Sequence, residues 1–194
     1  MRPDQWLGGW REVDPGEALR EVLRRYLRAY GPAAPGHFGQ WFDLSAPVAR
    51  GLAASMSGEL VEVSVEGERL LMPAEDAEGH PELDEDPEGG SVSLLPHFDC
   101  YLRGFHPRAQ LLAGHRERAG GGTGQFPILL IDGQVAGVWE RRRRGRRLEI
   151  RVDPFRRLSG QLSRQLQREA ARIGAFDEME VELTTGTVEV RAHL

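Results

Sequence analysis

Hydrophobic residues in the first part of the chain follow helical spacing and then change to the alternation of strands. Over residues 15–30 they recur every three or four positions, and Asp14 is placed to cap that helix. Two shorter helices are expected after Pro35 and after Ser45, the second with Val48, Leu52 and Met56 on its apolar stripe. Valines then alternate with polar residues and lead through a turn along residues 61–72, as in a β-hairpin. Three helices followed by a hairpin predict a winged helix.

Alternation dominates the second part of the chain. Two apolar runs flank Asp132-Gly133, a strong two-residue hairpin signal. A further strand is predicted at 148–152, an amphipathic helix at 158–173 and a last strand at 179–183. The predicted fold class is therefore α+β: an N-terminal winged helix, then a small antiparallel β-sheet, or a barrel made from it, carrying one amphipathic helix.

Composition predicts two folded domains joined by an acidic linker. Residues 74–92 are rich in Asp, Glu, Gly and Pro and nearly free of large apolar side chains, which is typical of a mobile linker. We therefore predict a winged-helix domain at 1–73, the linker at 74–92 and an antiparallel, barrel-like β domain with a C-terminal helix at 93–194.

The sequence carries no feature of a secreted, membrane or redox protein. It has no run of about 18 apolar residues, no export-like N-terminus and one cysteine, Cys100. We expect a soluble, cytoplasmic protein with no membrane contact, no cofactor and no metal. His97, His106 and His115 match no common zinc spacing. Asp99 is expected to fix loop backbone through hydrogen bonds rather than to position a water.

Arginine is the only basic residue type in the chain, and it is strongly clustered. There are 25 basic residues, yet the net charge is −5, which argues against a general nucleic-acid binder. Six arginines gather at a predicted hairpin tip, where their guanidinium groups repel one another unless anions neutralise them. DNA phosphates would do so; a solvated turn, or a clamp onto the acidic linker, is the alternative. The predicted phosphate-binding residues are Arg141, Arg142, Arg143, Arg144, Arg146 and Arg147.

The predicted winged helix offers few side chains for reading bases. Its third helix would enter the major groove, but residues 45–57 supply mainly Arg50 among small side chains. Arg69, in the predicted hairpin, is the other candidate for DNA contact. We therefore expect poor sequence readout, and a packing or protein-contact role is the alternative for this domain.

Four stretches of the chain together resemble one protein family. They are RYLRAYGPA at 25–33 with Trp41 downstream, LLPHFDCYL at 94–102, DGQVAGVW at 132–139, and the closing helix and strand. In this order they are similar to the winged-helix DNA glycosylases of the AlkZ type, over nearly the whole chain. The resemblance implies double-stranded DNA as partner and a role in excising alkylated or crosslinked bases.

The same resemblance implies that the family's catalytic part is missing. Its catalytic motif, two Gln or a Gln and an Asp around one apolar residue, lies in an earlier winged helix. Gln165-Leu166-Gln167 has matching letters, but Leu166 falls on the core-facing stripe of its helix, so an ordinary helix face is expected. We expect no catalysis by this chain alone, with a missing N-terminal half or a partner chain completing the enzyme. Two alternatives stay open: a misassigned start at Met1, and a protein-interaction or scaffold module without DNA binding.

Overall fold

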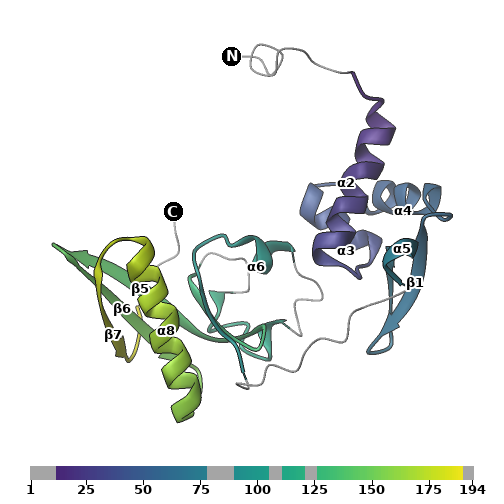
Figure 1. The fold of residues 1–194 in the computed structure, drawn as a ribbon. Coiled ribbons are helices and arrows are strands. Elements are labelled where there is room, and N and C mark those ends of the chain that lie inside the picture. The colour runs from purple at the N-terminus through teal and green to yellow at the C-terminus, as the bar shows by residue number, and fades with distance from the viewer. Residues whose placement is uncertain (1–11, 78–89, 105–110, 121–125, 190–194) are drawn as a thin grey trace. The chain divides into compact units, whose positions relative to one another are not determined.

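The structure is a computed structural model that describes residues 12–77, 90–104, 111–120 and 126–189 (Figure 1). The chain divides into two units, unit 1 (Met1–Pro81) and unit 2 (Glu82–Leu194). Among the described residues, no helix combines the length and the apolar character needed to cross a membrane.

The predicted linker at 74–92 is described only at its ends. Its first residues form a short helix, α5 (Ala74–Ala77), and Val92 begins a strand. Residues 78–89 lie outside the described residues. The division into domains at 1–73 and 93–194 therefore stays a prediction.

Between Pro15 and Pro73, unit 1 folds into three helices followed by a two-stranded antiparallel hairpin, in the predicted order. One hydrophobic cluster joins the first helix to the others and to the start of the hairpin. The elements are α2 (Pro15–Tyr30), α3 (Pro35–Phe42), α4 (Ala46–Ser55), β1 (Leu60–Val65) and β2 (Glu68–Pro73).

The first helix, α2, begins and ends where its sequence indicates. The Asp14 carboxylate accepts a hydrogen bond from the Glu17 N–H at 3.0 Å, which satisfies a backbone donor that the first turn leaves unpaired. At the other end, the Gly31 N–H donates to the Leu27 carbonyl at 2.8 Å. The predicted cap at Asp14 is confirmed.

The buried face of α4 differs from the one expected from its large side chains. Val48, assigned to the apolar stripe, is 49% exposed, whereas Ala49 and Ala53 are buried. A β-carbon built on Gly39 of α3 would lie 3.2 Å from that of Ala49, so only small residues allow the two helices to approach this closely. The stripe prediction is therefore wrong at Val48.

Unit 2 is built on a five-stranded sheet in the order β3-β4-β5-β6-β7. Helix α8 covers one face and the region of α6 lies toward the other (Figure 1). The elements are β3 (Val92–Leu95), α6 (Cys100–Gly104), β4 (Ile128–Ile131), β5 (Gln134–Arg144), β6 (Arg147–Pro154), α8 (Gly160–Phe176) and β7 (Glu180–Thr185).

Two features of this sheet correct the prediction of a purely antiparallel sheet or barrel. The strands from β3 to β6 pair antiparallel, but β7 pairs parallel to β6, with Leu148 opposite Val181. Helix α8 lies between β6 and β7 in the chain and returns it to the same end of the sheet, as a crossover helix does. Since β3 and β7 stand at opposite ends of the strand order, the sheet is open.

Alternating residues of the strands build two cores, one on each face of the sheet. Leu129 and Ile131 of β4 face the α8 cluster, which includes Leu166. Ile128 and Leu130 face a second cluster, which includes Leu102 of α6. Because β4 is buried on both faces, its sequence is continuously apolar.

Two of the sequence landmarks are held together by hydrogen bonds. The Trp139 indole N–H donates to the Leu95 carbonyl at 2.8 Å, and the Tyr101 hydroxyl donates to the Gly133 carbonyl at 3.1 Å. A β-carbon on Gly137 would lie 2.7 Å from the Asp153 carbonyl oxygen, so no larger residue fits there. These landmarks are therefore structural.

Candidate nucleic-acid interface

The arginine cluster lies on a long hairpin made of β5 and β6. Arg144 pairs with Arg147 across a two-residue turn of Gly145 and Arg146, and Gly145 takes a positive φ of 60° there. The prediction of a hairpin is confirmed, but Arg141–Arg144 belong to the strand rather than to the tip.

Strand alternation divides these arginines between the two faces of the sheet. Arg141 lies opposite Ile150 and Arg143 opposite Leu148, two residues that pack against α8, so both arginines lie on the α8 face. Arg142 and Arg144 consequently lie on the other face. The charge is therefore spread over two faces and a turn.

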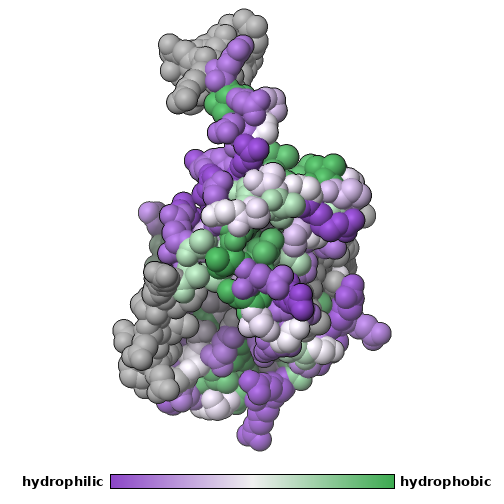
Figure 2. Space-filling model, turned by 90° about the vertical axis from the view of Figure 1, so that its right-hand side faces the viewer, coloured by the Kyte–Doolittle hydropathy of each residue, from purple (hydrophilic) through white to green (hydrophobic). Residues whose placement is uncertain are grey.

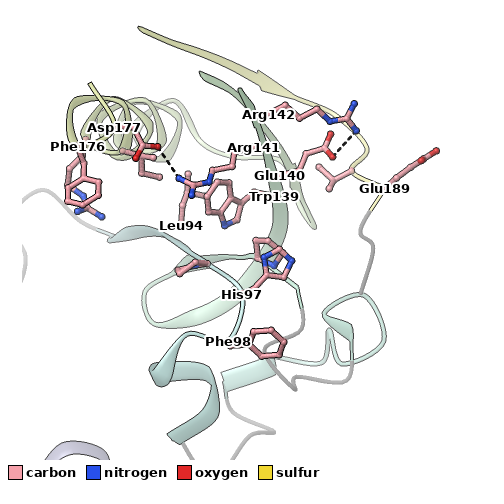
Figure 3. A pocket seen from close by; sticks show the side chains of 15 residues that line it. Leu94, His97, Phe98, Trp139, Glu140, Arg141, Arg142, Phe176, Asp177 and Glu189 are labelled. Carbon is pink, nitrogen blue, oxygen red and sulfur yellow. Dashed lines mark hydrogen bonds and ion pairs between the residues drawn. The ribbon is translucent and has the colours of Figure 1, made fainter. Parts of the chain in front are cut away.

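Four of the six arginines have carboxylate partners. On the α8 face, Arg141 contacts Asp177, at the C-terminal end of α8, at 3.0 Å (Figure 3). The helix dipole favours a cation at that end. The three pairs on the other face are Arg142–Glu140 at 3.3 Å, Arg144–Glu149 at 3.3 Å and Arg147–Glu180 at 3.8 Å.

Arg143 and Arg146 differ from the other four. Among the described residues neither has a carboxylate within ion-pair distance; Arg143 Nε makes only a long contact of 3.4 Å to the Gly145 carbonyl. Both side chains are exposed. Of the six arginines at the end of the hairpin, they are the two with free capacity for an anion among the described residues.

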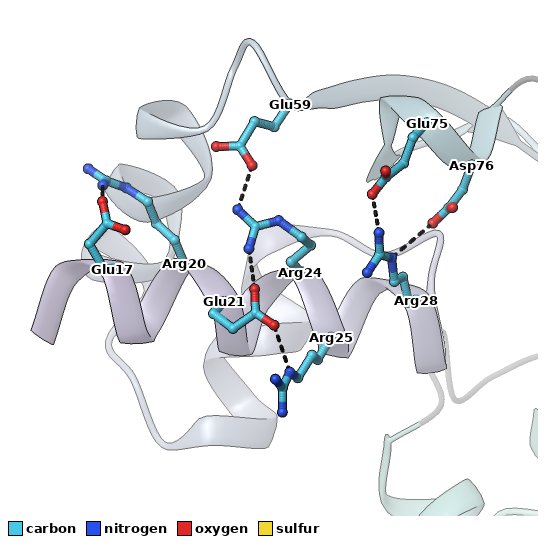
Figure 4. Close-up of polar contacts among 9 residues, drawn as sticks. All are labelled: Glu17, Arg20, Glu21, Arg24, Arg25, Arg28, Glu59, Glu75 and Asp76. Atoms are coloured by element: carbon cyan, nitrogen blue, oxygen red, sulfur yellow. Dashed lines mark hydrogen bonds and ion pairs between the residues drawn. The ribbon is translucent and has the colours of Figure 1, made fainter. Parts of the chain in front are cut away.

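A second arginine-rich surface, the α2 ladder (Arg20, Arg24, Arg25 and Arg28), is fully paired (Figure 4). Arg24 contacts both Glu21 and, at 2.6 Å, Glu59, and the hydrogen bond that Arg24 donates to Glu59 raises the pKa of Arg24 above its ordinary value. The other pairs are Arg20–Glu17, Arg25–Glu21, Arg28–Glu75 and Arg28–Asp76. Hydrogen bonds from Arg25 and then Arg24 hold the pKa of Glu21 below its ordinary value.

The two remaining candidate arginines lie in unit 1. Arg50 is exposed on α4 beside Ala53 and Ala54, and Arg69 of β2 is 82% exposed, 3.7 Å from Glu62. In Figure 2, hydrophobic and hydrophilic patches are interspersed on the visible face. The two candidate arginines of unit 1 are therefore isolated, whereas those of the hairpin form a cluster.

Other polar residues considered from the sequence have structural roles. The Asp99 carboxylate accepts a hydrogen bond from the Tyr101 N–H at 2.8 Å, as expected for a residue that fixes loop backbone. Leu166 is 1% exposed and faces the core, which confirms its assignment to the helix stripe. No group of metal-binding side chains occurs among the described residues; His106 lies outside them.

Sequence reasoning missed the carboxylates that neutralise the hairpin. Asp177 and Glu180 are distant from it in the chain and reach it only through the α8 crossover and the parallel pairing of β7. The alternation of strand side chains could have indicated the division of the arginines between two faces.

Comparison with known proteins supplies the family. Residues 2–176 match the model of the AlkZ-like DNA glycosylases. The chain is 36% identical over 133 residues to an interstrand DNA cross-link repair glycosylase of Streptomyces sahachiroi, covering 66% of this chain and 35% of that protein. The solved structure of Streptomyces sahachiroi DNA glycosylase AlkZ matches with a TM-score of 0.70 and 27% identity, over 92% of this chain and 48% of that one. The chain thus spans half or less of the length of these relatives, and it belongs to the AlkZ-like DNA glycosylase family.

Proposed function

We propose that this chain binds the backbone of double-stranded DNA through the β5–β6 hairpin and does not remove bases on its own. The observation that carries the proposal is the pair Arg143 and Arg146, exposed at the hairpin end without a carboxylate partner among the described residues. Phosphate oxygens match the forked donors of arginine. Membership of a DNA glycosylase family supports DNA as the anion.

In the same proposal, unit 1 is a winged helix that adds weak contacts. Its order of three helices and a hairpin supports this, with α4 as the helix directed to the groove and β1–β2 as the wing. Arg50 and Arg69 are the cations available from those elements. Because α4 otherwise offers small side chains, sequence preference is expected to be slight.

The absence of catalysis by this chain alone is part of the proposal. Excision requires groups that activate a water molecule for attack on the sugar carbon of the target nucleotide. The core position of Leu166 on α8 supports the view that Gln165 and Gln167 belong to an ordinary helix face. Activity is proposed to need a further segment of the kind present in the longer relatives, or a partner chain.

The test is binding of a fluorescein-labelled duplex, followed by anisotropy at low salt. The variant R143A/R146A is expected to lose about tenfold in affinity for every duplex sequence, because phosphate contacts carry no base information. The matched control R142A/R144A removes two arginines of the same hairpin that already contact carboxylates and should bind nearly like the parent.

Duplexes carrying alkylated purines should yield no abasic sites with the parent chain. Strand breakage after alkali treatment that depends on the lesion would refute the non-catalytic part. Equal binding by the parent and R143A/R146A would refute the role of the hairpin.

A further inference from the structure

Helix α8 packs one side against the sheet and exposes the opposite side. The residues that pack against the sheet recur at every fourth position, and they include Leu162, Leu166 and Ala170. Since each helical residue turns by about 100°, a residue two positions further on lies on the far side of the helix. Three exposed arginines occupy those positions: Arg164, Arg168 and Arg172. The outer side of α8 therefore carries a row of arginines.

The helix supplies little negative charge to neutralise this row. Glu169 is the only acidic residue of α8, and its side chain is only 11% exposed. Its carboxylate accepts hydrogen bonds from Arg172 at 2.8 Å and from the Leu94 N–H at 3.2 Å. The exposed surface of the outer side consequently presents no carboxylate of its own helix.

The positive charge is greatest at the first turn of α8. A β-carbon built on Gly160 would lie 3.8 Å from Arg164 Nη1, so this guanidinium reaches back over the start of the helix. Arg156 and Arg157 are exposed in the short connection that leads from β6 into the same turn. Among the residues that the structure describes, no carboxylate lies within ion-pair distance of Arg156, Arg157 or Arg164. We call these three the α8 arginine group.

The composition of the outer side favours the phosphate backbone of DNA as its partner. Up to Ala175, its exposed residues other than arginine are Gln161, Gln167 and Ala171. A protein or membrane partner would normally bury large apolar side chains, and this stretch exposes none. Arginine and glutamine are among the side chains that donate to phosphate oxygens. Membership of a DNA glycosylase family supports DNA as the polyanion.

We propose that the outer side of α8, with the α8 arginine group at its start, binds the phosphate backbone of duplex DNA as a surface separate from the hairpin. The inference rests on the proposed binding of duplex DNA but not on the role of the hairpin. Since α8 has 17 residues, it is about 25 Å long, and Asp177 at its end contacts Arg141. A duplex along α8 would therefore reach both surfaces within one turn of about 34 Å.

The test is anisotropy of a fluorescein-labelled duplex of about two turns, titrated with the full-length chain across a salt series. R157A/R164A is expected to bind about tenfold more weakly at low salt and to flatten the slope of log affinity against log salt by about 1.8, at about 0.9 per contact. The control R20A/R25A removes two arginines that contact Glu17 and Glu21, and it should bind like the parent.

Cross-linking locates the duplex on the helix. C100S removes the only cysteine of the chain, so that a photoreactive azide can be attached to one new thiol. A171C places it on the outer side of α8, and A18C places it on the exposed side of α2 as a control. A171C is expected to cross-link to the duplex, and A18C is not.

Three results would overturn the proposal: unchanged duplex affinity and slope in R157A/R164A, equal cross-linking from A18C, or binding of polyglutamate that R157A/R164A loses while it keeps the duplex. The role of the hairpin is tested separately. A flattened slope in R157A/R164A beside no effect of R143A/R146A would support the α8 surface and refute the hairpin. The reverse pattern would overturn the α8 surface alone.

Discussion

The α2 ladder and the β5–β6 hairpin are both rich in arginine, yet they differ in what the arginines contact. Every arginine of the ladder has a carboxylate from its own helix, from Glu59 or from α5 (Figure 4). In the hairpin, Arg143 and Arg146 have no such partner among the described residues. The number of arginines in a stretch therefore says less about DNA binding than the number left without a carboxylate.

The physical reason lies in the cost of exchanging partners. A paired guanidinium approaches DNA together with a carboxylate whose charge repels the phosphate, so its net attraction to DNA is small. A guanidinium without a carboxylate partner gives up only water and counterions when it binds a phosphate. We therefore propose that the ladder contributes to stability and the hairpin end to DNA binding, and the following experiments test that division.

Charge reversal should separate the two regions most strongly. R143E/R146E is expected to lower duplex affinity by about a hundredfold, because each contact becomes a repulsion. R20E/R25E, on the exposed side of α2, should leave affinity within about twofold, since these cations are already neutralised. Anisotropy titrations at one salt concentration measure both, and a comparable loss in the α2 variant would contradict the division.

Removing a ladder arginine should affect stability rather than binding. R24A breaks the contacts to Glu21 and Glu59 and is expected to cost about 1 kcal/mol, because its side chain is only 26% exposed and holds two carboxylates. Calorimetry should show the melting temperature of this unit falling by roughly 4–8 °C. R143A, which breaks no ion pair, serves as control and should melt like the parent.

The ladder should also give unit 1 an acid-sensitive component of stability. The pKa of Glu21 is lowered in the folded chain by Arg25 and Arg24, so its contribution is complete above the unfolded value near 4.5. It is lost as the pH falls through the lower, folded pKa. Below pH 4.5 the melting temperature should fall less steeply in E21Q than in the parent. An equal decrease of the melting temperature at acid pH in E21Q would show that other carboxylates account for the decrease.

The smallest effect on duplex affinity is expected from Arg50, the candidate DNA contact on α4 of unit 1. R50A should weaken duplex binding by about twofold, since one isolated cation on α4 contributes little beside the hairpin. Titration of duplexes of differing sequence would reveal any base preference carried by Arg50, and a tenfold loss would make α4 a principal DNA contact.

Local signals in the sequence predicted much of the fold. The cap at Asp14 and the turn at Asp132-Gly133, where both residues have positive φ, are present as expected. Each depends on neighbouring residues, and the physics of caps and two-residue turns is local. The sequence landmarks also identified the family. They include residues that hold the fold together, such as Trp139, whose indole N–H donates to the Leu95 carbonyl.

Features that depend on tertiary packing were not predictable in the same way. The parallel pairing of β7 follows from where α8 returns the chain, and the buried face of α4 follows from close packing at Ala49. The candidate site shows the same limit, since the cluster was found from charge density but the partners Asp177 and Glu180 come from distant elements. Which arginines are free is thus a tertiary property.

The most direct test of the account compares two double variants of the same hairpin. R143A/R146A removes the unpaired arginines, and R142A/R144A removes two that contact Glu140 and Glu149. Duplex affinity is measured for both across a salt series, and the slope of log affinity against log salt counts the phosphate contacts. The account predicts that R143A/R146A flattens the slope by about 1.8, at about 0.9 per contact, while R142A/R144A leaves it nearly unchanged. Equal flattening in both variants, or none in R143A/R146A, would contradict it.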